Sequence, residues 1–450
     1  MFIAQKTPGL SLNIVHGRGV EMFHGLLVSV VVTNERKACY NVVKVLYTLF
    51  LEITNKKIII YMKRLFFYIA FSSLALTINA QVIKIDVNPS SQPKGTLMLS
   101  ELVEHIEYIP LETNDHCIVG TISSFDISDN FIVVYVVQTD EIFLLTRTGR
   151  FITLIGRRGQ GPGEYISPGS VYIDEIKKCV YVKDGRRLLV YDFSGKHITT
   201  VSNDISNNSS ICAYLNNQFI LGTVSTRPKE DYYVYGIWDT AMKLVKQGVK
   251  GVPIDLKLPA GSSIGVIVVS PAISCYIYQG LAHLRESVLN DTIYQLNRSN
   301  EFIPKYIIHC GRYGMTPEAK GDIVHYQEVL PKYIGGMTFF ETSDFLLSRY
   351  YYKELMNFCY FDKKGKKLLY FNSKQGITDD YAGGIDFWPT KQINNYLYAF
   401  YDAPTLLDRY AQQKKVATKG PSATVQKVQS VIKKLDTEDN PVLIVAKIKQ

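Results

Sequence analysis

The feature that most constrains the fold is a short β-rich pattern that repeats after 46 residues. The segment Val134-Tyr135-Val136 recurs as Val180-Tyr181-Val182, and Gly149 in one turn corresponds to Gly195 in the next. Each copy contains two runs of alternating apolar and polar residues joined by turn residues, which is the pattern of a β-hairpin. Repeats of roughly 40 to 50 residues made of short strands indicate similar small sheets packed side by side.

Five such hairpins follow one another, at residues 142–155, 188–201, 233–245, 291–309 and 357–371. A sixth sheet is expected from residues 383–388 and 396–400, completed by residues 442–448 and 106–111 from near the two ends. Pairing the first and last strands would leave no exposed sheet edge. The sequence therefore predicts an all-β, six-bladed β-propeller closed by its N- and C-terminal strands.

One helical region interrupts the last of these sheets. Residues 406–416 and 424–435 place apolar side chains at helical spacing, and Pro421-Ser422 precedes the second run. Proline and serine at that position are typical of a helix start. We expect two short helices beside the last sheet.

A second beginning lies inside the chain, at Met62-Lys63-Arg64. An apolar run over residues 65–76 and a small residue, Ala80, follow these cations, which is the order of a secretory signal peptide. The run is shorter than the roughly 20 residues that a membrane span needs. We expect a signal peptide at residues 62–80, a linker at 81–96 and the propeller at 97–450.

Residues 1–61 then form an upstream extension. The favoured interpretation is a start site assigned too early, with Met62 as the initiator, and the alternative is a genuine membrane-proximal segment. Contact with a membrane is expected only through an uncleaved signal segment.

The net charge of +9 is concentrated at the start of the chain. Residues 1–80 contribute +6, so only +3 remains for residues 81–450. A surplus this small is no electrostatic footprint for nucleic acid. We expect no nucleic-acid partner.

Six cysteines follow residue 80: Cys117, Cys179, Cys212, Cys275, Cys310 and Cys359. They form no Cys-x-x-Cys pair and match no zinc-site spacing. Several stand beside apolar strand residues, which favours buried free thiols. A disulfide framework, which an exported protein can keep oxidised, is the alternative.

The most specific motif is Gly-x-x-Gly-x-Gly-Pro-Gly-Glu-Tyr at residues 156–165, followed by Val180-Tyr181-Val182-x-Asp184 and Tyr191-Asp192-x-x-Gly195. It resembles the NHL-type blade pattern, except that Gly185-Arg186-Arg187 replaces the usual Asn-containing turn. Residues 97–450 as a whole resemble a secreted six-bladed β-propeller family of unknown function from Gram-negative anaerobes. The resemblance implies export to the periplasm or beyond, and it implies no particular activity.

The Gly-rich loop supplies the first candidate ligand-binding residues. It lacks the Gly-Lys-Ser/Thr ending of a phosphate-binding loop, so a crossing between two blades is the favoured interpretation. Arg157 and Arg158 nevertheless make it basic, and Arg186 belongs to the same candidate set. Glu164 and Tyr165 enter the next blade near the central channel, although Glu164 is more simply explained by bonds to its own loop.

Aromatic clusters supply the remaining candidates, Arg349, Tyr350 and Trp388. Exposed aromatic rings at a channel mouth can stack on sugars or apolar ligands, with polar groups fixing the orientation. Packing between blades is the alternative, because tyrosine and tryptophan suit strands.

No catalytic set is recognisable. The histidines do not recur in phase, no Gly-x-Ser-x-Gly elbow is present, and Asp379-Asp380 would face apart on a strand. The sequence thus favours a non-catalytic binding or scaffold propeller without metal or cofactor, which recognises a glycan, peptide or protein partner at one face. A hydrolase or lyase with its active site at the channel mouth is the alternative.

Overall fold

The computed structural model describes residues 82–202, 210–222, 233–257, 273–286, 289–373, 375–413 and 416–450, with the short strands β1 (Leu12–Ile14) and β2 (Val28–Val30). The chain divides into two compact units, Met1–Ala80 and Gln81–Gln450. In the first unit, β1 and β2 pair antiparallel. The signal peptide expected at residues 62–80, and the rest of the expected extension, lie outside the described residues.

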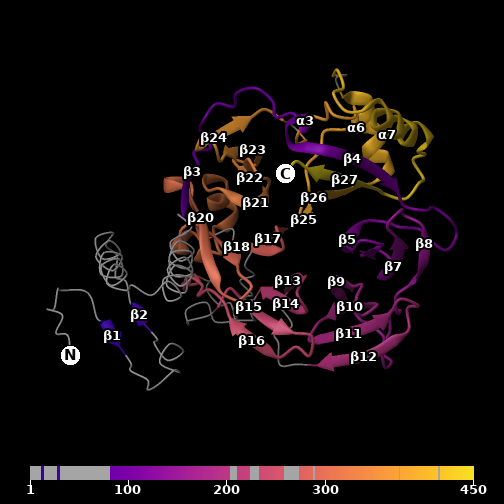
Figure 1. The fold of residues 1–450 in the computed structure, drawn as a ribbon, viewed down its shortest axis with the longest axis horizontal. Helices are drawn as coiled ribbons and strands as arrows, with labels where there is room; N and C mark the ends of the chain where they lie inside the picture. The colour runs from indigo at the N-terminus through magenta and orange to yellow at the C-terminus, as the bar shows by residue number, and fades with distance from the viewer. Residues whose placement is uncertain are drawn as a thin grey trace, which may run out of the picture. The chain divides into compact units, whose positions relative to one another are not determined.

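The second unit is mostly β, with few helices (Figure 1). Four antiparallel sheets have four strands each, in chain order. They comprise β5 (Ile122–Ile127), β6 (Phe131–Val136), β7 (Glu141–Thr146) and β8 (Phe151–Leu154); β9 (Pro168–Asp174), β10 (Cys179–Asp184), β11 (Arg187–Asp192) and β12 (His197–Ser202); β13 (Ser210–Leu215), β14 (Gln218–Gly222), β15 (Tyr235–Asp239) and β16 (Leu244–Gln247); and β21 (Gly335–Glu341), β22 (Phe345–Tyr352), β23 (Leu355–Asp362) and β24 (Lys367–Phe371).

The remaining strands form one nine-stranded sheet in the order β3-β20-β19-β18-β17-β25-β26-β27-β4. Its strands are β3 (Ile83–Asp86), β4 (Val103–Pro110), β17 (Ile273–Tyr278), β18 (Leu281–Glu286), β19 (Thr292–Leu296), β20 (Phe302–His309), β25 (Lys391–Ile393), β26 (Tyr396–Tyr401) and β27 (Val442–Ile448). It contains two antiparallel groups of four strands, β17 to β20 and β25-β26-β27-β4. A single parallel residue pair, Ile277 with Ile393, connects them.

Each group of four strands has its first strand near a common centre and its last strand at the periphery, as Figure 1 shows for β5 and β8, β9 and β12, and β17 and β20. Neighbouring first strands are joined by side chains. Ser124 and Asp126 on β5 accept hydrogen bonds from the backbone N–H groups of Val171 and Ile173 on β9, at 3.2 and 3.1 Å. These bonds satisfy edge N–H groups that would otherwise lack partners.

The 46-residue repeat corresponds to a repeated packing contact. Gly149 and Gly195 occupy equivalent turns between third and fourth strands, with φ of +86° and +82°. A Cβ atom added at Gly149 would lie 2.3 Å from Pro110 O, and one added at Gly195 would lie 2.1 Å from Leu154 O. Pro110 and Leu154 are the last residues of β4 and β8, each the last strand of the preceding group. Glycine is therefore required at both turns by backbone angle and by space.

Strands from the two ends of the second unit pair as expected. β27 runs antiparallel to β4, from Val442 opposite Pro110 to Ile448 opposite Val103. The buried side chain of Asn440 connects the approach to β27 with the segment after β4, because its Oδ1 accepts from Val119 N at 2.7 Å.

The expected strand at residues 383–388 is wrong. The first strand of that group is β25, and residues 383–388 form a loop in which Phe387 makes only an isolated bridge to Ile377. Pro389 follows directly and cannot donate to a strand ladder. Phe387 and Trp388 are instead buried as core residues.

The segment expected as a linker, residues 81–96, contains β3. This strand pairs in parallel with β20, from Ile83 opposite Tyr306 to Asp86 opposite His309. Farther on, Lys94 N donates to Tyr370 O at 2.8 Å. The segment thus runs along the outer strands of two neighbouring groups.

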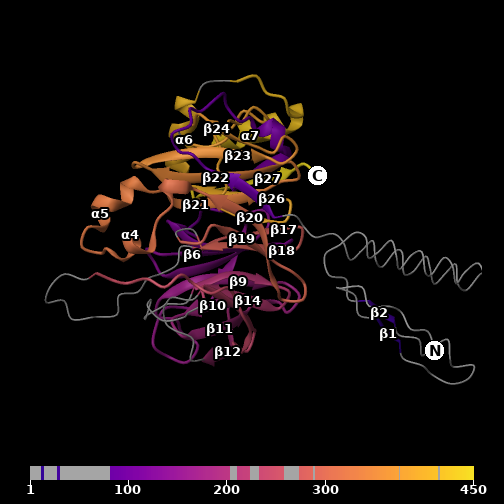
Figure 2. The same ribbon diagram turned by 90° about the vertical axis from the view of Figure 1, so that its left-hand side faces the viewer.

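The two expected helices are present as α6 (Ala403–Gln412) and α7 (Ser422–Lys434). Asp402 caps α6, its Oδ1 accepting from Thr405 N at 2.8 Å. The shorter helices are α3 (Leu99–Leu102), α4 (Pro317–Gly321) and α5 (Tyr326–Val329), with 3-10 turns η2 (Gly311–Tyr313) and η3 (Leu330–Lys332). Figure 2 shows α4 and α5 projecting from the sheets at a distance from α6 and α7.

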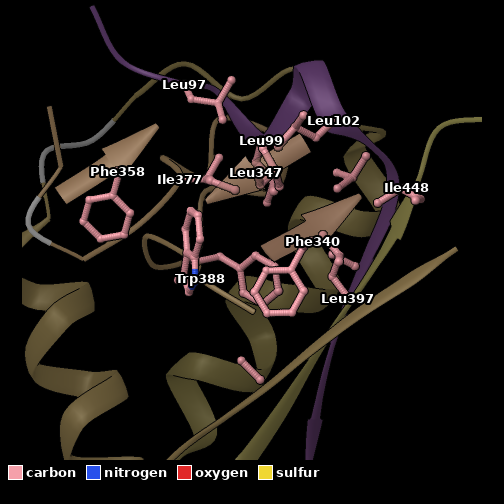
Figure 3. Packing of buried hydrophobic residues seen from close by; sticks show 14 of the residues in the cluster. Leu97, Leu99, Leu102, Phe340, Leu347, Phe358, Ile377, Trp388, Leu397 and Ile448 are labelled. Carbon is pink, nitrogen blue, oxygen red and sulfur yellow. The ribbon is translucent and has the colours of Figure 1, made fainter. Parts of the chain in front are cut away.

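The largest core cluster joins residues 85–108, at the start of the second unit, to the last sheets (Figure 3). The Trp388 ring lies 5.0 Å from the Phe358 ring and 6.2 Å from the Phe340 ring, measured between centroids. Leu97 and Leu99 are buried beside them. Each fully buried side chain of this kind contributes about 1.5 to 3 kcal/mol.

The six cysteines after residue 80 are free thiols, three of them buried and three partly buried. The expectation of free thiols is confirmed, and the disulfide alternative is not.

Candidate functional site

The Gly-rich loop joins β8 to β9 and is held by its own glutamate. Glu164 accepts a hydrogen bond from Gly161 N at 2.8 Å and one from Arg157 Nε at 2.6 Å. The bond from Gly161 N, and after it the bond from Arg157, hold the pKa of Glu164 below its ordinary value. The favoured interpretation of Glu164 as a residue that bonds its own loop is confirmed.

The other candidates of this region divide into exposed and buried residues. The side chains of Arg157 and Arg158 are 82% and 67% exposed, and Arg158 Nη1 lies 2.7 Å from Asp140 Oδ2. Arg186 is exposed in the turn between β10 and β11. Tyr165 is buried in the core between the first two sheets. Both loop arginines are thus paired with carboxylates, and Tyr165 offers no surface to a ligand.

The aromatic candidates lie in the core. Tyr350 and Trp388 are 0% and 2% exposed, and the Arg349 guanidinium lies 5.9 Å from the centre of the Trp388 ring. Burial lowers the pKa of Arg349. Alternation along β22 turns Tyr350 inward, whereas Tyr351 is 49% exposed. The structure therefore agrees with packing for Tyr350 and Trp388.

A polar network that sequence reasoning missed surrounds Glu341, the buried last residue of β21. Its carboxylate accepts hydrogen bonds from Tyr306 at 2.7 Å and from Tyr276 at 2.9 Å. It also pairs with the ammonium groups of Lys363 at 2.7 Å and Lys305 at 3.0 Å. Donors from β17, β20 and the β23–β24 turn thus meet at one carboxylate.

The charges of this network do not cancel. Burial opposes ionisation of Glu341, but the ammonium groups of Lys305 and Lys363 outweigh it and lower the pKa of the carboxyl to about 2. The carboxylate is therefore charged at neutral pH. Two ammonium groups share it, so the group carries one excess positive charge.

His283 adds no charge at neutral pH. Its ring stacks on Tyr276 with centroids 4.7 Å apart, and its Nδ1 lies 3.2 Å from Leu281 O. A carbonyl oxygen only accepts, so Nδ1 carries the proton and Nε2 accepts from Lys305 Nζ at 3.0 Å. Burial, with the nearby charge of Lys305, lowers the pKa of His283 to about 4.

A pocket with a volume of about 520 Å³ adjoins the network. It is lined by Tyr278, Gln279, Gly280, Ser343, Asn394, Asn395, Lys449 and Gln450. These residues follow the first strands β17, β21 and β25 or precede the C-terminus, so the pocket lies where three turns meet. Asn394 ties two of the turns together, its Oδ1 accepting from Gly280 N at 2.7 Å.

The network and the pocket share the ring of Tyr278. The Nζ atoms of Lys305 and Lys363 lie 5.7 and 5.5 Å from its centroid. Sequence reasoning missed these residues because each reads alone as an ordinary turn or strand-end residue.

No metal centre was found: the described residues contain no group of three His, Cys, Asp or Glu side chains placed to hold an ion. In the part of the chain that the structure describes, no helix has the length and apolar character needed to cross a membrane.

Two of the solved structures that resemble this chain come from Bacteroides species. A protein of Bacteroides fragilis described as exported has 18% sequence identity and a TM-score of 0.58, over 82% of this chain and 100% of that chain. A DUF4221 family member from Bacteroides vulgatus has 11% identity and a TM-score of 0.47, over 78% of this chain and 98% of that one. At 18% identity the likeness to the Bacteroides fragilis protein concerns the fold alone.

Among curated proteins, none matches the sequence. One family description, "Domain of unknown function (DUF4934)", matches residues 80–447, which is nearly all of the second unit. The chain therefore belongs to the DUF4934 family of unknown function.

Proposed function

We propose that this protein is an exported, non-catalytic six-bladed β-propeller that binds a glycan in the pocket between the turns after β17, β21 and β25. The observation that carries the proposal is the chemistry of the pocket wall, which consists of amide and hydroxyl side chains, one tyrosine and one lysine, around a volume of about 520 Å³.

The propeller is supported by six antiparallel groups of four strands that follow one another along the chain, with first strands toward the centre (Figure 1). The last group takes three strands from the end of the chain and β4 from its start. A strand arrangement of this kind leaves only short edges.

Export to the periplasm or the extracellular space is supported by the signal-like segment at residues 62–80. The Bacteroides fragilis protein of similar fold is also described as exported.

Glycan binding is supported by the hydrogen-bonding groups of the pocket wall, whose amides complement the hydroxyl groups of a sugar. An Asn or Gln amide both donates and accepts hydrogen bonds, as does a sugar hydroxyl. Within the described part of the chain, the side chains of Ser343 and Asn395 have no hydrogen-bond partner, so they are available to a ligand. The wall contains no aliphatic side chain to receive the apolar side chains of a peptide.

Binding is favoured over hydrolysis or lyase chemistry by the state of Glu341. Both of its oxygens are occupied by tyrosine and lysine donors. A general base needs a carboxylate oxygen within hydrogen-bond reach of a substrate proton, and this carboxylate is already saturated.

The proposal is tested by screening the purified secreted protein against an array of oligosaccharides and peptides, followed by calorimetry of each ligand found. We expect a saccharide to bind, and Asn395→Ala to weaken it about tenfold, as the loss of one or two hydrogen bonds implies. Ser343→Trp, which fills the pocket, should abolish binding.

Gln160→Ala and the double variant Arg157→Ala with Arg158→Ala are the controls, because these exposed residues lie in the loop between β8 and β9. They should bind as the unaltered protein does. Binding of peptides alone, or a saccharide affinity that Ser343→Trp leaves intact, would overturn the proposal.

A further inference from the structure

We infer that the glycan carries an anionic group, a carboxylate or a sulfate, which binds to Lys363 with Lys305 supplying additional positive charge. The inference rests on the proposed function, because it names the chemical class of the ligand in the same pocket.

The network beside the pocket carries an excess positive charge. Lys305 and Lys363 both pair with the single carboxylate of Glu341, which leaves one positive charge without a counter-ion. In the pocket wall, the charge of Lys449 is offset by the carboxylate at the end of the given sequence, on Gln450, so neither adds to this excess. The region is therefore positive and attracts anions.

Neighbouring charges do not cancel this excess. Lys364 and Asp344, from the two adjacent turns, pair with each other at 2.9 Å. His283 is neutral at pH 7, because its pKa is lowered by burial and by Lys305.

The ammonium group of Lys363 has a hydrogen-bond donor that is available to a ligand. Lys363 Nζ has three N–H groups, of which one binds Glu341 and one binds Thr342 O at 2.5 Å. Its third N–H has no hydrogen-bond partner among the described residues. Lys363 is not part of the pocket wall, but its Nζ lies 5.5 Å from the centre of the Tyr278 ring, which is. This donor is therefore adjacent to the pocket.

Lys305 and Lys363 are both partly buried. The side chains of Lys305 and Lys363 are 25% and 18% exposed, so they are accessible but poorly hydrated. A hydrogen bond from a cation to an anion is roughly twice as strong as one between neutral groups. A neutral sugar would leave this donor and the excess charge unused.

The test compares sugars that differ only in charge. Calorimetry is performed on the secreted protein with galacturonate against galactose, glucuronate against glucose, and galactose 6-sulfate as the sulfate arm. We expect at least one anionic sugar to bind tenfold or more tightly than its neutral counterpart, with the stronger arm identifying carboxylate or sulfate as the group recognised.

Lys363→Met should remove this preference while leaving the affinity for the neutral sugar unchanged. Lys364→Met is the matched control, because Lys364 stands next in the chain, is 78% exposed and pairs with Asp344. Should Lys363→Met fail to fold, Lys363→Arg keeps the charge and should keep the preference. Raising salt from 0.05 to 0.5 M should weaken only the anionic sugars.

Two negative outcomes have different meanings. Equal affinity for acidic and neutral sugars, or a preference that Lys363→Met leaves intact, overturns this inference but not glycan binding. Absence of binding by every sugar of the array overturns the proposed function as well.

Discussion

The ammonium group of Lys305 on β20 lies 3.0 Å from the carboxylate of Glu341 on β21, and this ion pair joins the last strand of one group to the first strand of the next. Tyr276 on β17 bonds to the same carboxylate at 2.9 Å. A buried charge is tolerated only while its partners are present. Glu341 therefore anchors the polar contacts between these groups, beside the apolar contacts of the core cluster.

Replacing Glu341 with glutamine should lower the free energy of unfolding by about 3 kcal/mol, because two partly buried ammonium groups lose their counter-ion. Urea unfolding followed by circular dichroism measures the change. Glu328→Gln is the control, since Glu328 is exposed in α5, and it should change stability by less than about 0.5 kcal/mol. A loss below about 1 kcal/mol for Glu341→Gln would contradict the role given to the network.

Acid should destabilise the protein in two successive pH windows, which overlap near pH 4. The pKa of His283 is about 4 in the folded protein and its ordinary value is 6.5, so the unfolded chain binds the proton more readily. Stability is therefore lost as pH falls from 6.5 toward 4, by up to about 3 kcal/mol. The pKa of Glu341 is lowered from 4.5 to about 2, so its contribution is lost as pH falls from 4.5 toward 2.

Unfolding midpoints in urea at pH 7, 5.5, 4 and 3 separate the two groups. His283→Gln should flatten the profile between pH 6.5 and 4 and leave the lower window unchanged. If this variant and the unaltered protein lose stability in parallel over the upper window, another group is responsible.

Local patterns in the sequence predicted much of the fold. The turns at Gly149 and Gly195, the pairing of residues 442–448 with residues 106–111, and the two helices were all readable, because period and turn chemistry determine them. β25 was missed because its three residues, Lys391–Ile393, are too few to show alternation.

The polar network around Glu341 could not be predicted from sequence patterns. Tyr276 and Glu341 are 65 residues apart, and they meet only because neighbouring groups pack first strand beside first strand. Hydrophobic alternation indicates which face of a strand is buried, but it does not indicate which polar side chain of the next sheet lies opposite. For the same reason the sequence left both a surface role and packing open for Trp388, which is buried.

Gly195→Ala should destabilise the protein by about 2 kcal/mol or more, because its φ is +82° and the new Cβ would lie 2.1 Å from Leu154 O. Gly169→Ala is the matched control, since its nearest neighbour beyond the chain would be Lys183 O at 3.8 Å. That control should fall within about 1 kcal/mol of the unaltered protein. Thermal unfolding of both variants gives the comparison, and equal values would exclude the packing contact as the reason for glycine.

Reducing agent should leave the unfolding temperature unchanged, because the six cysteines after residue 80 are free. Burial raises the pKa of the Cys117 thiol to about 11, so it is protonated at pH 7 and reacts slowly. A thiol reagent should therefore label buried cysteines such as Cys117 and Cys359 only after urea is added. A lower unfolding temperature in dithiothreitol would instead reveal a disulfide.

Asn440→Ala should weaken the contact between the two ends of the second unit. The amide Nδ2 donates to Glu112 O at 2.6 Å and to Cys117 O at 2.7 Å, while Oδ1 accepts from Val119 N. Truncation leaves these backbone groups without partners, and each costs about 1 to 3 kcal/mol when buried. We expect a loss of at least about 2 kcal/mol in urea unfolding.

The matched control for Asn440→Ala is Asn114→Ala, in the segment after β4 that Asn440 contacts. Asn114 Oδ1 bonds to His116 N at 2.8 Å, but this bond is exposed, so water can replace it. Hydrogen exchange adds a local measurement, because Asn440→Ala should speed exchange at Val119 and along the β4–β27 pairing, whereas Asn114→Ala should not. Similar losses in both variants would mean that burial of Asn440 does not determine how the two ends are held together.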